Sequence, residues 1–207
     1  MCFNISIVNS KDAIEKQLDA EFDIDSSFKP QKHISAFTNP LIPIITSENR
    51  NNIQLCHWGL IPKWVKDIKK ANEIRKMTYN AKSETIKEKP SFREAKRCVI
   101  VADGWYEWKK EAQSKTPFYH HLNGQVFHFA GLYNSEGCLI VTTEACSKLS
   151  HVHHRMPVLL EDLEIRDWLG GKDVFASPLS NLIHTYPVTK YVNNPRNDDE
   201  NCSKELT

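Results

Sequence analysis

The stretch Cys98-Val-Ile-Val-Ala-Asp-Gly-Trp-Tyr-Glu-Trp108 contains the strongest strand signal in this chain of 207 residues. β-Branched and aromatic side chains follow one another along it, and such residues favour an extended backbone that packs against a core. We predict a single strand over 98–108. Because side chains alternate between the two faces of a strand, Trp105 and Glu107 should share one face.

On either side of this stretch, short apolar runs alternate with polar turns. We predict further strands over 2–8, 34–37, 41–45, 53–58, 116–122, 125–133, 138–143, 156–160 and 186–192, and helices over 11–22 and 161–169. Between two of these strands, Asn123-Gly124 is the preferred pair for a two-residue type I′ turn and predicts a hairpin. About nine short strands with few helices indicate an α+β fold, in which a mixed, folded β-sheet forms a barrel-like (pseudobarrel) core with short peripheral helices.

The composition is that of a globular protein, with 40% hydrophobic and 26% charged residues. The length suits a single domain, which we place over 1–194, followed by a polar C-terminal tail, 195–207, that we expect to be frayed. No apolar run approaches the roughly 20 residues of a membrane-spanning helix, and the first residues do not resemble a secretion signal. We expect a cytoplasmic protein with no membrane partner, and a monomer.

The six cysteines include no Cys-x-x-Cys pair. In a chain without a secretion signal, this indicates reduced thiols rather than disulfides or a zinc site. His151 and His153 could place two imidazoles on one face of a strand, but the sequence offers no third ligand beside them. Since a glycine-rich phosphate loop is also missing, we predict no metal site and no cofactor. One histidine of this segment is better interpreted as an acid or base near neutral pH.

The segment 61–110 is basic, with 14 Lys or Arg against 7 Asp or Glu, although the net charge of the whole chain is +1. This asymmetry indicates an anionic partner or, alternatively, a solvated helical face. Lys63 and Trp64 combine a positive charge with a ring that is prone to exposure. Bases of single-stranded nucleic acid stack on such rings while lysines neutralise phosphates, so we interpret Trp64 as a stacking residue and assign Trp58 to the core.

Cys2 becomes the first residue if Met1 is removed, which is normal before a small residue. Its amine and thiol would then lie on adjacent carbons, with reference pKa values of about 7.7–8.0 and about 8.5. Such an amine forms an imine with an aldehyde, and the thiol then closes a five-membered thiazolidine ring. The alternative is that Cys2 is a small apolar residue at the start of an edge strand.

Three further polar residues are candidates for chemistry. Asn80 and Lys82 lie in a polar segment that could line a cleft, where the amide would hold a carbonyl or an amine and the ammonium a phosphate. Alternatively, they are a helix cap and a surface lysine. Glu107 lies among aromatic residues, so desolvation should raise its carboxyl pKa and suit it to proton transfer, unless it faces water while the tryptophans pack inward.

Six motifs follow an initial Met-Cys in a fixed order. They are W-G-L-I-P-K-W, N-A-K-S-E-T, R-C-V-I-V-A-D-G-W-Y-E-W, T-P-F, F-A-G-L-Y and H-H-R-M-P-V. Together they resemble the SRAP family, the SOS response-associated peptidases, which are also known as abasic-site processing proteins. The resemblance runs from Met1 to about Asn194 and covers nearly the whole chain.

The resemblance implies specific roles. In the family, the mature N-terminal cysteine forms a covalent thiazolidine with the open-chain aldehyde of an abasic site in single-stranded DNA, a role that falls on Cys2. The family's asparagine, glutamate and histidine fall on Asn80, Glu107 and His153. The resemblance also implies an α+β pseudobarrel with a basic groove. The DNA-contacting residues that we expect are Asn4, Lys63, Trp64, Lys82 and Arg155.

Two of these positions depart from the family pattern. Asn4 stands where the family often has arginine, so one phosphate contact is lost. Lys82 also replaces a usual arginine, which keeps the charge but loses the bidentate fork. Both changes concern DNA affinity and leave the crosslinking chemistry intact.

We therefore expect an abasic-site sensor of the DNA damage response, which binds single-stranded DNA and crosslinks to it, with lyase-type or thiol autopeptidase-type activity. One alternative is a cysteine peptidase that removes its own Met1, with Cys2 as nucleophile and His153 as base. The other is a binder of single-stranded DNA that forms no covalent bond.

Overall fold

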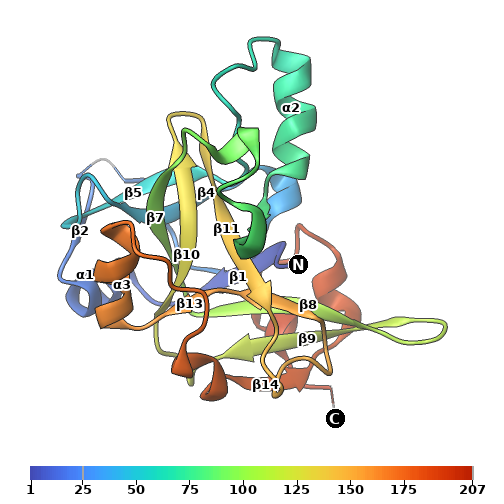
Figure 1. Ribbon diagram of the computed structural model, residues 1–207. Helices are drawn as coiled ribbons and strands as arrows, with labels where there is room; N and C mark the ends of the chain where they lie inside the picture. Colours follow the sequence, from blue (N-terminus) through green and yellow to red (C-terminus); the bar gives the residue numbers. More distant parts are fainter. Residues whose placement is uncertain (25, 207) are drawn as a thin grey trace.

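In residues 1–24 and 26–206, which the computed structural model describes, the strands form two sheets (Figure 1). The smaller sheet has the order β14 (His184–Pro187), β9 (Lys115–His121), β8 (Gly104–Lys110), β1 (Asn4–Ile7) and β3 (Gln31–Ser35). The larger sheet has the order β12 (Arg155–Pro157), β11 (Gly137–Glu144), β10 (Phe127–Asn134), β7 (Lys96–Ala102), β4 (Leu41–Thr46), β5 (Asn52–His57) and β2 (Glu21–Phe22). Two short strands join it, β13 (Leu159–Leu160) on β10 and β6 (Asn80–Lys82) on β11.

The helices are short and lie at the periphery of the sheets (Figure 1). The α-helices are α1 (Lys11–Leu18), α2 (Ile68–Met77) and α3 (Asp162–Leu169). Single 3₁₀ turns are η1 (Ala36–Thr38), η2 (Ser83–Thr85), η3 (Pro90–Phe92), η4 (Pro178–Asn181), η5 (Lys190–Asn193) and η6 (Glu200–Ser203). None of the helices in the described residues is long and apolar enough to cross a membrane. The prediction of an α+β fold with a mixed, folded sheet is confirmed, and in the described residues the two sheets do not close into a complete barrel.

The predicted strand over 98–108 is two strands, and they belong to different sheets. β7 ends at Ala102 and β8 begins at Gly104, so the chain passes from the larger to the smaller sheet at Asp103. The hydroxyl of Ser6 and the backbone N–H of Asn9 donate to the Asp103 carboxylate, at 2.9 and 3.0 Å, and fix this corner. A Cβ atom at Gly104 would collide with the Tyr119 ring, so only glycine fits there.

The Asn123-Gly124 turn forms as predicted, but the hairpin around it does not. Both residues have positive φ, 48° and 77°, and the Gln125 N–H donates to the Leu122 carbonyl at 2.9 Å. However, β9 pairs with β8 and β14, whereas β10 pairs with β7, β11 and β13. The reason is burial: nearly every residue of β10 is buried, so this strand needs neighbours on both edges in the larger sheet. β8 and β9 form the actual hairpin, and its tip projects from the body (Figure 1).

Two smaller boundaries also differ from the prediction. The first helix ends at Leu18 rather than Phe22, because Asp19 adopts the left-handed conformation with φ of 48°. Phe22 then pairs with Ile53 in the larger sheet. The last strand ends at Pro187 rather than Val192, and the following residues form the turn η5.

The C-terminal segment packs against the smaller sheet, so the expected frayed tail is wrong for residues up to 206. The Asp198 carboxylate accepts the backbone N–H groups of Lys32 and His33 in β3, at 2.6 and 3.1 Å. Cys202 is fully buried, and the Leu206 N–H donates to the carbonyl of Pro187 in β14. This segment therefore helps to hold the edge of the sheet that contains β1 and β3.

Candidate active site

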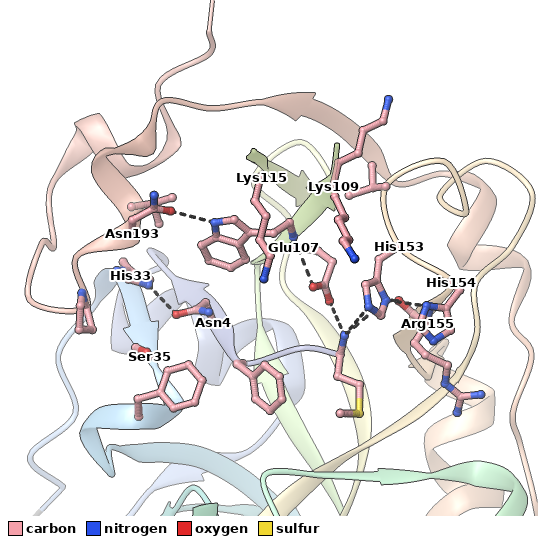
Figure 2. Close-up of a pocket in the computed structure, with 18 of the residues that line it drawn as sticks. Asn4, His33, Ser35, Glu107, Lys109, Lys115, His153, His154, Arg155 and Asn193 are labelled. Atoms are coloured by element: carbon pink, nitrogen blue, oxygen red, sulfur yellow. Dashed lines mark hydrogen bonds and ion pairs between the residues drawn. The ribbon is translucent and has the colours of Figure 1, made fainter. Parts of the chain in front are cut away.

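The N-terminal amine, which is that of Met1, lies against two polar side chains (Figure 2). Its nitrogen is 2.9 Å from Oε2 of Glu107 and 3.3 Å from Nε2 of His153. Strand pairing places it there: Asn4 in β1 is opposite Tyr106 in β8, so the residues before Asn4 run past Glu107. β1 is flanked on its other edge by β3, which fixes the first residues from both sides.

Glu107 is only 7% exposed, on the same face of β8 as the core residue Trp105. Burial raises the pKa of the Glu107 carboxyl, and the nearby N-terminal amine opposes this only in part. The expectation of a desolvated glutamate is thus confirmed, and the alternative of a water-facing one is wrong. A carboxyl with a raised pKa next to an amine can exchange protons with it near neutral pH.

His153 lies on the other side of the amine, in the loop before β12 (Figure 2). The backbone N–H and the carbonyl of Arg155 lie 2.9 and 3.1 Å from its Nδ1 and hold the ring in place, while Nε2 faces the amine. Burial, followed by the positive charge of the amine, lowers the pKa of His153. His154 stacks on it with ring centroids 4.4 Å apart and is itself more exposed. The geometry therefore gives His153 a fixed ring whose lowered pKa favours the neutral form, which can accept a proton and pass it on.

Asn80 and Cys2 complete the group. Asn80 opens β6, and its Nδ2 donates to the carbonyl of Cys2 at 2.8 Å. The Cys2 side chain is fully buried, and burial, with the charge of Glu107, raises the pKa of its thiol. The structure thus brings together the four residues that the sequence predicts to be catalytic, Cys2, Asn80, Glu107 and His153.

The amine opens into a pocket of about 920 Å³ (Figure 2). Lys82, Lys109, Lys110 and Lys115 line it, together with Arg155. Of the described residues that line it, Glu107 is the one carboxylate. The pocket therefore has a positive wall and suits an anionic ligand.

The five residues that we expected to contact DNA are placed differently from one another. Lys82 lines the pocket, with its side chain exposed. Arg155 also lines it, but the guanidinium is buried and donates to the Glu84 carboxylate at 2.6 and 2.9 Å. The buried Asn4 has its Oδ1 bound to His33 Nε2 at 2.9 Å. Lys63 and Trp64 are exposed and lie outside the pocket lining.

Several lining residues are absent from our predicted set. The lysines of the β8–β9 hairpin, Lys109, Lys110 and Lys115, could have been found, because two of them directly follow Trp108 in the basic segment. Phe3 and Phe37 could not, since neither lies in a recognisable motif. In the part of the chain that the structure describes, no three His, Cys, Asp or Glu side chains are placed to hold a metal ion.

Comparisons with known proteins agree with this arrangement. A family model described as "SOS response associated peptidase (SRAP)" matches residues 1–195. The abasic site processing protein YoqW of Bacillus subtilis (strain 168) is 34% identical, over 96% of this chain and 96% of its own length. The abasic site processing protein HMCES of Xenopus tropicalis is 30% identical, over 70% of this chain and 55% of its own length.

Solved structures show the same fold. The crystal structure of a protein from Bacteroides thetaiotaomicron matches with a TM-score of 0.83 and 30% identity, over the whole of both chains. A protein from Bordetella bronchiseptica matches with a TM-score of 0.77 and 22% identity, over 91% of this chain and all of that one, which shows similarity of fold.

Proposed function

Since this chain belongs to the SOS response associated peptidase (SRAP) family, we propose that it processes abasic sites in single-stranded DNA. Once Met1 is removed, the protein joins itself to the sugar of such a site through a thiazolidine ring on Cys2. One observation supports this proposal: the start of the chain runs past Glu107 and His153, which lie 2.9 and 3.3 Å from the amine of Met1, the residue before Cys2, in a pocket lined by lysines.

The reaction needs an aldehyde, which the abasic sugar supplies when its ring opens. The Cys2 amine adds to the aldehyde carbon C1′ and, with loss of one water, forms an imine. The thiol then adds to the imine carbon, and the nitrogen takes up the thiol proton. A C–N bond and a C–S bond form at the same carbon, so the product is a five-membered ring and water is released.

Each neighbouring side chain has a role in this scheme. Glu107, whose pKa is raised by burial, carries protons between the amine and the departing hydroxyl. His153 takes up a proton and delivers it to the sugar ring oxygen. Asn80 holds the carbonyl of Cys2 and so fixes the position of the first residue. Since burial raises the pKa of the Cys2 thiol, ring closure needs a base, and Glu107 is close enough for its charge to act on the thiol.

The lysines of the pocket would hold the DNA backbone. Lys82 on one wall and the lysines of the β8–β9 hairpin on another are free to contact phosphates on either side of the abasic sugar. We assign Arg155 a positioning role instead, because its guanidinium is bound to Glu84. Lys63 and Trp64 would reach the strand only beyond the pocket.

The test is crosslinking to a single-stranded oligonucleotide with one abasic site, followed on a denaturing gel. Intact mass first confirms that Met1 is absent. We expect a shifted band whose mass is that of protein plus DNA minus one water. Two matched controls should give no band: Cys2→Ala protein, and DNA with a tetrahydrofuran analogue that has no aldehyde. A band of equal yield with Cys2→Ala, or no band with mature protein, would refute the proposal.

A second candidate is that the chain cleaves its own Met1–Cys2 bond, which would be a peptidase activity. The contact of the Met1 amine with Glu107 and His153 favours it. Intact masses of Glu107→Gln and His153→Ala distinguish the two origins of the mature terminus. Retained Met1 in both variants supports self-cleavage, whereas complete removal in both contradicts it.

A further inference from the structure

An exposed aromatic ring lines the same pocket as Glu107 and His153. Phe37, in the turn η1 between β3 and β4, is 63% exposed and lines the pocket. Its ring centroid is 5.4 Å from that of Phe3, the residue that directly follows Cys2. Neither ring takes part in the chemistry proposed above. A single exposed apolar residue is ordinary, but one that lines the pocket of a charged ligand needs a further explanation.

Tyr79 fixes the orientation of the Phe37 ring. Phe37 packs edge-on against Tyr79, with centroids 5.8 Å apart and planes at 86°. Phe3 meets Tyr79 in a similar edge contact, at 6.2 Å and 79°. Tyr79 is almost fully buried, and the next residue, Asn80, binds the Cys2 carbonyl. The three rings therefore form a rigid unit, the aromatic platform, that is tied to the N-terminal residue.

The charge around the platform identifies its ligand. Lys82, Lys109, Lys110 and Lys115 line the same pocket, and of the described residues there Glu107 is the one carboxylate. The side of the pocket formed by Asn4 and Ser35 lies across from His153 and Arg155 (Figure 2). An aromatic face among cations is the combination that binds single-stranded nucleic acid, because bases stack on the ring while phosphates pair with lysines.

An abasic site gives this ring a specific partner. A nucleotide without a base leaves its neighbour in the strand with one unstacked face. We propose that Phe37, held by Phe3 and Tyr79, stacks on the nucleobase next to the abasic site and replaces the missing stacking partner. This inference rests on the proposed function and names the part of the DNA, besides the aldehyde, that the site recognises.

The experiment measures how protein variants bind DNA variants that have no aldehyde and so cannot form the covalent bond. Dissociation constants of wild-type protein and Phe37→Ala are measured by fluorescence anisotropy on three oligonucleotides. The first has one tetrahydrofuran residue among thymines, and the other two have a second tetrahydrofuran on its 5′ or its 3′ side. Phe37→Tyr, which keeps the ring, and Leu163→Ala, an exposed apolar residue on α3 outside the pocket, are the controls.

We expect wild-type protein to lose about 5- to 100-fold in affinity when one of the two neighbouring bases is removed. On the first oligonucleotide, Phe37→Ala should bind more weakly than the wild type by the same factor. Phe37→Ala should bind the other two oligonucleotides with the same affinity as the first. Equal affinity of wild-type protein for all three oligonucleotides would overturn the inference, whatever the folding of the variants. So would an equal loss for Phe37→Ala on all three, since the contact would then be to the backbone.

The outcome is independent of the crosslinking test. The effects of Phe37→Ala and of removing the neighbouring base are coupled if the second effect disappears in the variant. If this coupling is found but aldehyde-containing DNA gives no crosslink, the stacking site stands and the proposed chemistry fails. If the crosslink forms and no coupling is found, the proposed function stands and the aromatic platform is not a base-stacking site.

Discussion

Replacing Glu107 by glutamine tests proton transfer at the site. The substitution keeps the size and shape of the side chain and removes its negative charge together with its ability to take up and release a proton. Glu107 Oε2 is 2.9 Å from the amine of Met1, so this carboxyl lies within one residue of the Cys2 amine that reacts once Met1 is removed. A rate effect of the substitution should therefore come from the chemistry at the start of the chain.

The expected loss of rate follows from this contact. A positioned acid–base group contributes about 10²–10⁴-fold, which corresponds to about 2.7–5.5 kcal/mol of activation free energy. His153 is also close, at 3.3 Å, so Glu107→Gln should remain active at the slower rate. The assay is a single-turnover time course of crosslinking at saturating abasic DNA. Glu111→Gln is the matched control, because it removes the same charge from an exposed position of the same hairpin.

The same variant should be more stable than the wild type. Burial raises the pKa of Glu107 above its ordinary value of 4.5, so the folded protein binds a proton that the unfolded chain has released. Wild-type stability due to this group is therefore present below pH 4.5 and is lost as the pH rises through the raised pKa. Urea unfolding should show Glu107→Gln gaining on the wild type as the pH is raised from 4 to 8.

The reasoning fails if Glu107→Gln crosslinks within twofold of the wild-type rate over this pH range. It also fails if Glu107→Gln both crosslinks more slowly and unfolds at lower urea than the wild type, because a disrupted fold would explain both results. A slower but more stable protein is the combination that only a buried, functional carboxyl predicts.

Three further predictions concern the surroundings of the site. Glu84→Gln should lower the free energy of unfolding by about 1–3 kcal/mol, because the buried Arg155 guanidinium loses its partner. The ion pair with Arg155 lowers the pKa of Glu84 to about 2. In urea titrations, the difference in stability between the variant and the wild type should therefore shrink as the pH falls from 4.5 toward 2. Burial lowers the pKa of His128 to about 4, so its contribution to stability should fall by about 2 kcal/mol from pH 6.5 to 5, a loss that should be missing in His128→Gln. Asp198→Ala should cost about 1–2 kcal/mol by removing the acceptor for two β3 amides, and an unchanged urea midpoint would contradict the role of the C-terminal segment.

Local patterns predicted those parts of the fold that local interactions determine. The burial of Glu107 followed from alternation along β8. The positive φ angles of Asn123 and Gly124 followed from residue type, because asparagine and glycine tolerate this conformation best. The pairing of the strands could not be predicted from these local patterns. The break between β7 and β8 at Asp103 depends on the hydrogen bond from Ser6, which is distant in the sequence. The separation of β9 from β10 depends on which strands pair with the two edges of each. Such long-range partners leave no periodicity in the sequence.

The same division applies to the site. Cys2 stood out because of its chemistry, and Asn80, Glu107 and His153 through motifs that resemble a family. The partners of Asn4 and Arg155 could not be predicted, since any polar side chain in the chain could have bound them. Whether a cation is free to contact DNA or is held in an ion pair is decided by such partners. Both residues line the pocket, and their contact with DNA remains a prediction that residue type alone supplied.

The placement of the Met1 amine also sets the time at which its surroundings form. The N-terminus leaves the ribosome first, but Glu107 and His153 are synthesised much later, and β1 lies between β3 and β8. The group of side chains around the terminus therefore exists only once the chain has been completed beyond His153. Translation itself thus delays assembly of the site, and an extension fused before Met1 would have to pass through the pocket.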